Sequence, residues 1–429
     1  LWNLNATGAH VVSILLNILI SWFVLSLLYQ MLMNPYAALF GAALFAAHPI
    51  HVEAVALASN REELLCALFF FAAFYMYMLW RPRRQNIVAF LLLTGTAFAM
   101  SMFSKEMAAS LPAVLVAYDF LMPVEGRTRR QCIKSGLPFY LITGAVVVAF
   151  IVVKFTWMRN AAGAAQPPAS TLWLSFLTMC RAFTMYIELL VAPVRLCAQH
   201  LILPANGAFG FYLFFAAGLL AFIIIALLLI KKNPLASFAM FFFLISLLPV
   251  SNIIPFGEIF AERYAFIPSF TLPLIAGIIF IKMEKTKMLR AALAVAVVAA
   301  AVAVTFIQSG IWKSDLSLWS DTVKCEPRSF TAHHNLGNFY AAKGDFKSAL
   351  AEYAVAKTCP KQADLHKLAY NRGLALLAIG KTGEAKEAFV ESIRNNPDFA
   401  MPHFNLGAIA EREGNHILAD FHYQRAIDK

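Results

Sequence analysis

Long apolar runs separated by short polar breaks fill the first three quarters of the chain, and a polar, repetitive sequence follows from about Ser309. At about 1.5 Å per helical residue, most of these runs can cross, or nearly cross, a hydrocarbon layer roughly 30 Å thick. We therefore predict an all-α protein, with a polytopic membrane helical bundle over residues 1–308 and a soluble helical domain over residues 309–429. The apolar runs are 9–33, 36–48, 62–80, 87–103, 107–121, 136–156, 172–192, 209–231, 235–249, 264–282 and 288–308.

The charges indicate how the bundle is oriented. Apolar residues make up 60% of the chain and charged residues 14%, whereas soluble domains have about 25% charged residues. The net charge of +11 comes largely from short basic tracts between apolar runs. Such tracts mark cytoplasmic loops, so we expect no nucleic-acid partner. The tracts are residues 81–84, 127–134, 231–232 and 282–290.

These tracts also restrict the number of crossings. Three apolar runs lie between the tracts at 127–134 and 231–232, where only an even number can cross. We predict that 172–192 is interfacial or re-entrant, because Arg181 and Glu188 would each cost about 2.5–3.5 kcal/mol at mid-membrane. Ten spans then place both ends of this chain outside the cytoplasm. We expect a bacterial inner membrane with the polar domain in the periplasm, or the endoplasmic reticulum with that domain in the lumen.

The polar domain repeats itself every 34 to 36 residues. An Asn-x-Gly triplet recurs, with an alanine twelve residues after its glycine and an aromatic residue four further on. This pattern is typical of the tetratricopeptide helix pair, so we predict an α-solenoid of about three repeats that binds protein. The chain ends without a polar capping helix, so we expect the array to continue. The repeated positions are Asn335, Gly337, Ala349 and Tyr353; Asn371, Gly373, Ala385 and Phe389; Asn405, Gly407, Ala419 and Tyr423.

The six cysteines show no C-x-x-C spacing. Cys325 and Cys359 are one repeat length apart, and equivalent positions in neighbouring repeats are too distant to bridge. We therefore predict no disulfide framework.

Three polar stretches lie in loops assigned to the non-cytoplasmic face, where ionisable groups beside a membrane are functional candidates. The first runs from His48 through His51 and Glu53 to Arg61 and Glu63; the second is Ser104-Lys105-Glu106; the third holds Pro249-Val250-Ser251-Asn252 and Ala261-Glu262-Arg263-Tyr264.

His48, His51 and Glu53 are candidates for a supporting role in the chemistry. Histidine and carboxylate side chains can bind Zn or Mn, but spacings of three and two residues do not share one helical face. We therefore expect no metal, and a divalent metal site and helix capping around Pro49 remain alternatives.

The other candidates form a predicted substrate-binding set. Arg61 and Arg263 are the preferred phosphate ligands, since arginine binds phosphate through two parallel hydrogen bonds. The alternative is an ion pair with a neighbouring carboxylate, and Lys105 with Glu106 equally fits a local salt bridge. The whole set is Arg61, Glu63, Lys105, Glu106, Glu262, Arg263 and Tyr264.

Together with the repeats and with Trp312-Lys313-Ser314-Asp315 through Trp319, these stretches resemble the transmembrane and tetratricopeptide-repeat-containing (TMTC) family and its bacterial relatives. The resemblance implies a GT-C-type glycosyltransferase that moves a sugar, usually mannose, from a polyprenyl phosphate to a protein hydroxyl. The implied partners are that lipid-linked sugar, an acceptor protein held by the repeats, and membrane lipid. The rival hypothesis is a non-catalytic membrane scaffold.

Two departures from the family pattern matter. The family's catalytic carboxylate lies in the first outer loop, and Leu1-Trp2-Asn3-Leu4-Asn5 resembles the end of that loop, so we expect the catalytic residue upstream of Leu1. Gln199-His200 stands where the family tends to have an Asp-Tyr pair, which puts the role of that loop in question.

Overall fold

The computed structural model describes residues 6–157, 171–205, 209–253, 258–284, 286–360 and 364–429, and all regular structure in these ranges is helical. The chain divides into two compact units. Unit 1 comprises Leu1–Leu196 and Ile202–Gly310, and unit 2 comprises Cys197–Leu201 and Ile311–Lys429. The predicted all-α class, with an apolar helical bundle followed by repeats, is confirmed.

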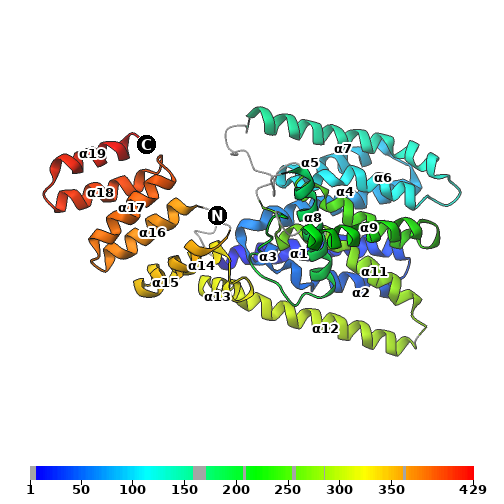
Figure 1. Cartoon of the computed structure of the whole chain (residues 1–429). Helices are drawn as coiled ribbons and strands as arrows, with labels where there is room; N and C mark the ends of the chain where they lie inside the picture. Colours follow the sequence, from blue (N-terminus) through cyan, green and yellow to red (C-terminus); the bar gives the residue numbers. More distant parts are fainter. Residues whose placement is uncertain (1–5, 158–170, 206–208, 254–257, 285, 361–363) are drawn as a thin grey trace. The chain divides into compact units, whose positions relative to one another are not determined.

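Unit 1 is a bundle of long apolar helices joined by short 3-10 turns (Figure 1). Its helices are α1 (Ala6–Leu32), α2 (Pro35–Ala46), α3 (Val52–Ala56), α4 (Arg61–Arg83), α5 (Ile87–Ser104), α6 (Leu111–Leu121), α7 (Arg129–Trp157), α8 (Leu172–Val191), α9 (Phe209–Lys232), α10 (Pro234–Leu247), α11 (Thr271–Lys282) and α12 (Lys287–Ile311).

Asn-Pro pairs begin two of these helices. The Asn34 side chain accepts hydrogen bonds from the backbone N–H groups of Tyr36 and Ala37, and Asn233 caps Ala236 in the same way. The following Pro35 and Pro234 take the first helical position, where no N–H group is required. Because hydrocarbon cannot satisfy the first N–H groups of a helix, such caps define where α2 and α10 begin.

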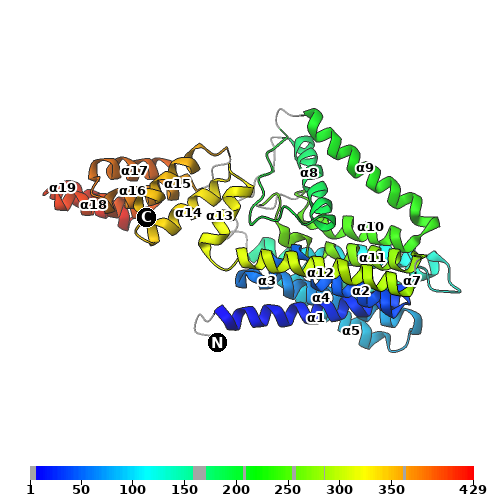
Figure 2. The same ribbon diagram turned by 90° about the horizontal axis from the view of Figure 1, so that it is seen from below.

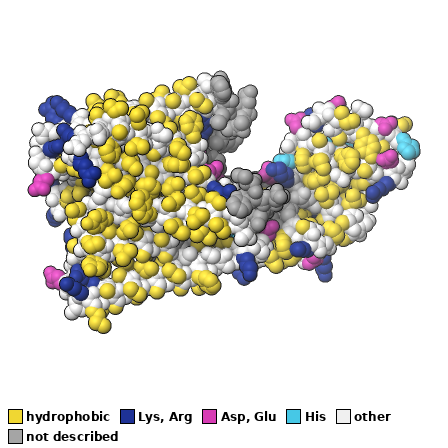
Figure 3. Space-filling view, turned by 180° about the vertical axis from the view of Figure 1, so that it is seen from behind, with side chains coloured by type: hydrophobic (Ala, Val, Ile, Leu, Met, Phe, Trp, Pro, Cys, Tyr) yellow, Lys and Arg dark blue, Asp and Glu magenta, His cyan; other side chains and the backbone are white. Residues whose placement is uncertain are grey.

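Aromatic rings fill the interior of unit 1. Phe71 packs edge-on against Phe45 with ring centroids 6.1 Å apart, and Phe242 lies 5.1 Å from Phe270. The outer surface is also apolar, and Figure 3 shows hydrophobic side chains covering the sides of unit 1. A unit that is apolar inside and outside is suited to lipid surroundings.

The basic tracts lie at helix ends that gather at one end of unit 1 (Figures 1 and 3). Helix α4 connects this end with the opposite one, because it begins at Arg61 in the first polar stretch and ends at Arg83 in the first basic tract. Its 23 residues correspond to about 34 Å of helix, roughly one membrane thickness.

Seven of the described helical segments are long and apolar enough to cross a membrane, or eight if the bent pair Pro35–Ala46 and Pro49–Ala56 is one span. The predicted ten spans therefore depend on short helices. Helices α10 and α11 have 14 and 12 residues, and α6 has only 11. The count of ten remains a prediction.

Helix α8, the segment predicted not to span, is long and apolar enough to do so. It nevertheless runs across the direction of α4, α7 and α12 in both Figure 1 and Figure 2. Arg181 and Glu188 form an ion pair at 3.1 Å on this helix. An interfacial or re-entrant position fits this arrangement and stays a prediction.

Unit 2 consists of α13 and three antiparallel helix pairs that follow one another in order (Figure 1). The first helix of each pair holds a glycine that faces an aromatic ring of the second: Gly337 faces Tyr353, Gly373 faces Phe389 and Gly407 faces Tyr423. The helices are α13 (Asp315–Cys325), α14 (Phe330–Ala342), α15 (Phe346–Thr358), α16 (Leu365–Ala378), α17 (Thr382–Asn395), α18 (Ala400–Arg412) and α19 (His416–Ile427).

The prediction of no disulfide was wrong. Cys197 and Cys325 are bonded, with Cα atoms 6.6 Å apart, while Cys359 is a free buried thiol. The bonded cysteines are 128 residues apart in sequence, and Cys197 lies far before the repeats, so the spacing of the cysteines along the chain gives no sign of the bond. The short segment around Cys197 belongs to unit 2, where Gln199 accepts a hydrogen bond from the Ser329 hydroxyl at 2.6 Å.

Close packing at the repeat glycines predicts that Gly373→Ala destabilises unit 2. A Cβ atom there would lie 2.6 Å from Cε1 of the fully buried Phe389. Overpacking of this kind costs about 1–3 kcal/mol. Hydrogen–deuterium exchange of α16 and α17 in the full chain should become faster. The matched control is Gly383→Ala on α17, where the added methyl meets nothing within 4 Å, and exchange should stay the same or slow. Equal exchange in both variants would contradict the packing argument.

Because α8 runs across the direction of α4, α7 and α12, we predict that both ends of α8 lie on one side of the membrane. Single cysteines at Thr171 and Ala192, which flank the helix, should react with an impermeant maleimide from the same side of sealed vesicles. Other cysteines are replaced in this background. Labelling of the two positions from opposite sides would mean that α8 spans, and a neighbouring helix would then have to stay on one side.

Candidate functional site

Two cations and four carboxylates meet where the three polar stretches come together. We call Glu53, Glu62, Glu63, Lys105, Glu258 and Arg263 the Arg263 cluster. The cluster is assembled from α3, the first turn of α4, the residue after α5, the 3-10 turn η5 (Glu262–Ala265), which holds Arg263, and the loop before η5, which holds Glu258. All of these segments belong to unit 1.

Arg263 is held mainly by Glu53. The two Glu53 carboxylate oxygens accept hydrogen bonds from the Arg263 backbone N–H, at 2.9 Å, and from its Nη1. Nη2 lies 2.5 Å from Oε2 of Glu258, and Nε lies 3.8 Å from Oε1 of Glu63. Burial acts to lower the pKa of Arg263, but the charges of Glu53 and Glu258 outweigh it and raise the pKa above its ordinary value. The guanidinium is therefore a fixed positive charge.

Lys105 binds the first turn of α4. Its Nζ lies 2.8 Å from Oε1 of Glu62 and 2.6 Å from Oε1 of Glu63. Burial acts to lower the pKa of Lys105, and the charge of Glu63 together with hydrogen bonds to both carboxylates raises it. Because Glu63 contacts both Lys105 and Arg263, one buried carboxylate joins the two cations. The Tyr264 ring lies under both, 5.5 Å from Nζ of Lys105 and 5.0 Å from Cζ of Arg263.

The cluster divides into buried anchors and exposed carboxylates. The side chains of Glu53 and Glu63 are 3% and 4% exposed, whereas those of Glu62 and Glu258 are 52% and 56% exposed. Four carboxylates against two cations leave two negative charges in excess when all six groups are ionised. The exposed carboxylates are the groups that an incoming anion could displace, because about half of each side chain is accessible.

The ion pairs join separate loops, whereas the sequence had suggested pairs between neighbours. Lys105 pairs with Glu62 and Glu63 rather than with Glu106, and Glu106 lies 3.9 Å from Lys154 instead. Consecutive side chains diverge from a turn or a helix, so they seldom face each other. Glu262 is buried at the start of η5 and contributes no ion pair to Arg263 among the described residues.

Arg61 stays outside the Arg263 cluster. It begins α4, and its buried Nε atom has no hydrogen-bond partner in the part of the chain that the structure describes. Among those same residues it forms no ion pair. Arg61 is therefore a candidate anion ligand close in sequence to Glu63.

The two histidines have structural contacts. His48 donates from Nε2 to the Leu190 carbonyl at 3.0 Å and accepts from the Ile50 N–H at 3.2 Å, so it caps the 3-10 turn that follows, as the capping alternative expected. His51 lies 2.8 Å from the Ser269 hydroxyl and packs against Phe266. In the described ranges, no group of three or more His, Cys, Asp or Glu residues could hold a metal ion.

Glu62 and Glu258 belong to the cluster, although the sequence did not predict them as site residues. Both were visible as carboxylates of non-cytoplasmic loops. Their exposure and their distance from Lys105 and Arg263 depend on how three distant segments pack, so a linear pattern could not have distinguished them from other surface carboxylates.

A comparison with family models gives two matches. Residues 1–157 match the family described as dolichyl-phosphate-mannose-protein mannosyltransferase, and residues 366–399 match the tetratricopeptide repeat. The first match covers the part of unit 1 that contains Glu53, Glu63 and Lys105.

The similar curated proteins are named protein O-mannosyl-transferases. The protein O-mannosyl-transferase F38B6.6 of Caenorhabditis elegans is 29% identical over 320 residues, which cover 72% of this chain and 44% of the relative. The Drosophila melanogaster protein O-mannosyl-transferase Tmtc3 is 25% identical, covering 83% of this chain and 44% of the relative. The human protein O-mannosyl-transferase TMTC4 is 26% identical, covering 81% of this chain and 54% of the relative. The chain thus spans about half the length of these relatives.

The relatives extend through both units, and the two family models match the bundle and the repeats separately. The resemblance found in the polar stretches and in the repeat spacing is thereby confirmed. The two family models and these relatives support a TMTC-like family of membrane proteins with tetratricopeptide repeats.

Proposed function

We propose that this protein is a membrane glycosyltransferase of GT-C type that moves mannose from a polyprenyl-phosphate donor to a protein hydroxyl. The observation that carries the proposal is the Arg263 cluster, which holds two fixed cations and two exposed carboxylates at the end of α4 opposite the basic tract. The names of the relatives support mannose as the sugar and a protein as the acceptor.

The cluster suits a reaction in which a phosphate leaves. The acceptor hydroxyl would attack the anomeric carbon of the sugar, the bond from that carbon to the phosphate oxygen would break, and the phosphate would depart with the bonding electrons. Lys105 and Arg263 would stabilise the negative charge that grows on the phosphate. The hydroxyl proton would pass to a carboxylate acting as general base, which the family resemblance assigns to the family's first outer loop.

Phosphate binding requires that Arg263 exchange one partner. Glu258 is the exposed partner of Nη2, whereas Glu53 binds Nη1 and the backbone from the buried side. A phosphate that replaces Glu258 would keep the guanidinium anchored and gain a charge-assisted contact. Arg61, which has no ion pair among the described residues, could supply a second contact.

The repeats are proposed to hold the acceptor protein. Asparagine side chains line the first helices of successive repeats: Nδ2 of Asn371 donates to Oδ1 of Asn338 at 2.9 Å, and Asn405 donates to the Tyr370 hydroxyl at 3.3 Å. Side-chain amides can pair with the N–H and C=O groups of an extended polypeptide. This row supports recognition of a peptide backbone.

We also propose that the repeats and the Arg263 cluster face the periplasm, or the endoplasmic reticulum lumen if the source is eukaryotic. The basic tracts at the opposite end of unit 1 favour this orientation. The Cys197–Cys325 disulfide supports it independently, because structural disulfides persist in oxidising compartments and are rare in the cytosol.

The first prediction of this proposal concerns Arg263. In the full-length protein, Arg263→Ala should weaken binding of mannosyl polyprenyl phosphate by about ten- to a hundred-fold, since a charge-assisted contact is worth roughly 1.5–3 kcal/mol. Glu258→Gln should instead strengthen donor binding, because it weakens the carboxylate that competes for Nη2. Both would be measured as affinity per folded molecule, together with the melting temperature.

A destabilising substitution elsewhere in unit 1 provides the control. The Tyr140 hydroxyl donates to Asp119 in a partly buried contact between α6 and α7, and Tyr140→Phe should lower the melting temperature without changing donor affinity. If Arg263→Ala behaves like Tyr140→Phe, Arg263 is a structural ion-pair partner. Absence of sugar transfer by the intact protein would favour the scaffold hypothesis.

The second prediction concerns sidedness. Single cysteines at Lys343 in the repeats and at Arg129 at the start of α7 should be labelled by an impermeant reagent from opposite sides of sealed vesicles. A cysteine replacing Arg263 should react from the same side as the one at Lys343. Labelling of Lys343 and Arg129 positions from one side would reject the orientation.

A further inference from the structure

We propose that a basic pocket between the first two repeats of unit 2 binds an acidic segment of the acceptor protein, with Arg372 as its central contact. This inference rests on the proposed role of the repeats in holding the acceptor. The pocket has a volume of about 590 Å³ and is lined by α15, α16 and α17. It can hold a few side chains of a partner, since ligand sites span roughly 300–1,000 Å³.

Cations outnumber carboxylates in the lining of this pocket, by four to two. A third carboxylate, Glu413 at the end of α18, lies outside the lining and pairs with Lys386 at 2.5 Å. Four positive charges thus face three negative ones, so the pocket favours an anionic ligand. The charged lining residues are Lys357, Arg372, Lys386, Arg394, Glu387 and Glu391.

The cations of the pocket are only partly satisfied. Glu391 joins two of them, because its Oε1 lies 2.6 Å from Nζ of Lys357 and its Oε2 lies 3.1 Å from Nη2 of Arg372. The Nε atom of Arg372 has no hydrogen-bond partner among the described residues, and in the same set Arg394 forms no ion pair. The Arg372 side chain is 29% exposed, so a ligand can reach the guanidinium.

Comparison of the three repeats with one another distinguishes Arg372. It is the middle residue of its Asn-x-Gly triplet, and the equivalent residues are Leu336 in the first repeat and Leu406 in the third. Both leucines are buried, with 4% and 7% exposure. An arginine at this position gives up apolar burial that the neighbouring repeats obtain from leucine. The stability of the array therefore does not explain Arg372, whereas a ligand does.

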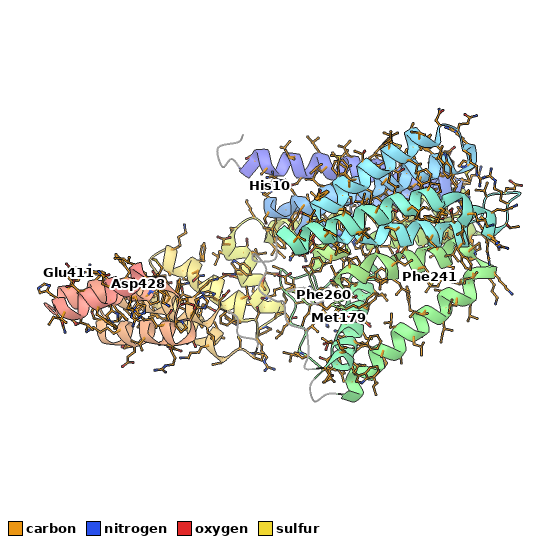
Figure 4. The ribbon with its side chains drawn as sticks, turned by 90° about the horizontal axis from the view of Figure 1, so that it is seen from above. His10, Met179, Phe241, Phe260, Glu411 and Asp428 are labelled. Carbon is orange, nitrogen blue, oxygen red and sulfur yellow. A yellow bond between two sulfur atoms is a disulfide. The ribbon has the colours of Figure 1, made fainter. Side chains whose placement is uncertain are left out.

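Two other cations are also particular to the second repeat. Lys386, Val390 and Arg394 line the pocket at intervals of four residues, so they share one face of α17. In the third repeat, the residues equivalent to Lys386 and Arg394 are Asp420 and Asp428. Figure 4 labels Asp428, which follows α19. The third repeat therefore carries the opposite charge at both positions.

The pocket is separate from the row of asparagine side chains. Asn371 contacts Asn338, whereas the next residue, Arg372, reaches Glu391 on α17. Consecutive residues of an α-helix point about 100° apart, so these two side chains leave α16 in different directions. The row can hold a peptide backbone while the pocket takes acidic side chains.

Glu391 indicates which ligand the pocket fits. Its carboxylate bridges a lysine and an arginine, so the spacing of these cations suits a carboxylate. A carboxylate of the partner can replace Glu391 on Arg372, and a neighbouring one can bind Arg394. Adjacent Asp and Glu residues of an acceptor protein supply two such groups. The pocket therefore selects acceptors with an acidic segment over neutral ones.

The test measures the fluorescence anisotropy of labelled peptides that bind the full-length protein in the absence of a sugar donor. One short peptide carries pairs of Asp and Glu residues between serines and threonines, and its matched version carries Asn and Gln in their place. The natural protein should bind the acidic peptide about ten-fold more tightly. Equal affinities for the two peptides would overturn the proposal.

Two substitutions in the pocket should act in opposite directions. Arg372→Leu introduces the residue that the other repeats bury at this position, so the fold should persist while affinity for the acidic peptide falls about ten-fold. Glu391→Gln removes the carboxylate that competes for Arg372 and should raise this affinity. Unchanged affinity in both variants would make the Arg372–Glu391 pair purely structural. Should Arg372→Leu fail to fold, Arg394→Gln decides, because this exposed substitution should weaken binding of the acidic peptide alone.

The matched control is Arg412→Leu in the last turn of α18, which removes the same charge from an exposed position outside the pocket. It should leave affinity for the acidic peptide unchanged. Equal losses in Arg412→Leu and Arg372→Leu would mean that only net charge matters, and would overturn the proposal. Inorganic phosphate that displaces the peptide as well as an unlabelled acidic peptide does would identify a site for small anions and overturn it too.

Sugar transfer separates this inference from the proposed function. Preferential binding of the acidic peptide by a protein that transfers no sugar would retain the acidic-segment site and refute the enzyme activity. Transfer to both peptides with the same KM would retain the enzyme activity and overturn the inference.

Discussion

Glu53 is a carboxylate with only 2% of its surface exposed, and a buried charge without a partner strongly destabilises a fold. Arg263 compensates this buried charge, because its backbone N–H and its side chain both donate hydrogen bonds to the Glu53 carboxylate. The two residues are 210 positions apart in the sequence. The contact connects α3 with the turn η5. Through Glu63 it continues to Lys105 after α5, so the meeting of three separate polar stretches depends on it.

The carboxylates around Arg263 and Lys105 differ in burial, so each cation can be held in a fixed position and still exchange one of its partners for a ligand. Buried Glu53 and Glu63 hold the cations from one side, while exposed Glu62 and Glu258 occupy the faces that a ligand could approach. A cation paired only with exposed carboxylates would be poorly ordered, and one paired only with buried carboxylates would have no free coordination to offer. The division of partners gives Arg263 and Lys105 a fixed position and an exchangeable contact.

Lipid surroundings and water impose different rules on the two units. In unit 1 the helices must satisfy their own backbone polar groups, so Asn-Pro caps begin α2 and α10. Buried charges also need partners there, and Asp119 of the Arg81–Asp119 ion pair accepts further hydrogen bonds from the hydroxyls of Tyr77 and Tyr140. In unit 2, stability comes from repeated glycine–aromatic contacts, and a disulfide adds a covalent link to the segment that follows α8. That link makes residues 197–201 part of the repeat unit, although they lie between two helices of the bundle in sequence.

The sequence by itself determined the helical class, the apolar character of unit 1 and the repeats of unit 2, because each depends on a periodic or compositional pattern spread over many residues. The family resemblance was also visible in the sequence, in the order of its short polar stretches and in the repeats. It also identified most of the charged candidates, since cations and carboxylates in otherwise apolar loops are conspicuous. Only the tertiary structure decided which of them meet. Lys105 pairs with Glu62 and Glu63 and not with Glu106, Arg61 lies outside the cluster, and Cys197 is bonded to Cys325. Contacts between distant segments depend on how the helices pack, so no regular spacing in the sequence predicts them. The sequence also did not predict which carboxylates are buried. Glu53 is buried and Glu258 is exposed, and this difference in exposure determines which of them anchors Arg263 and which could be exchanged.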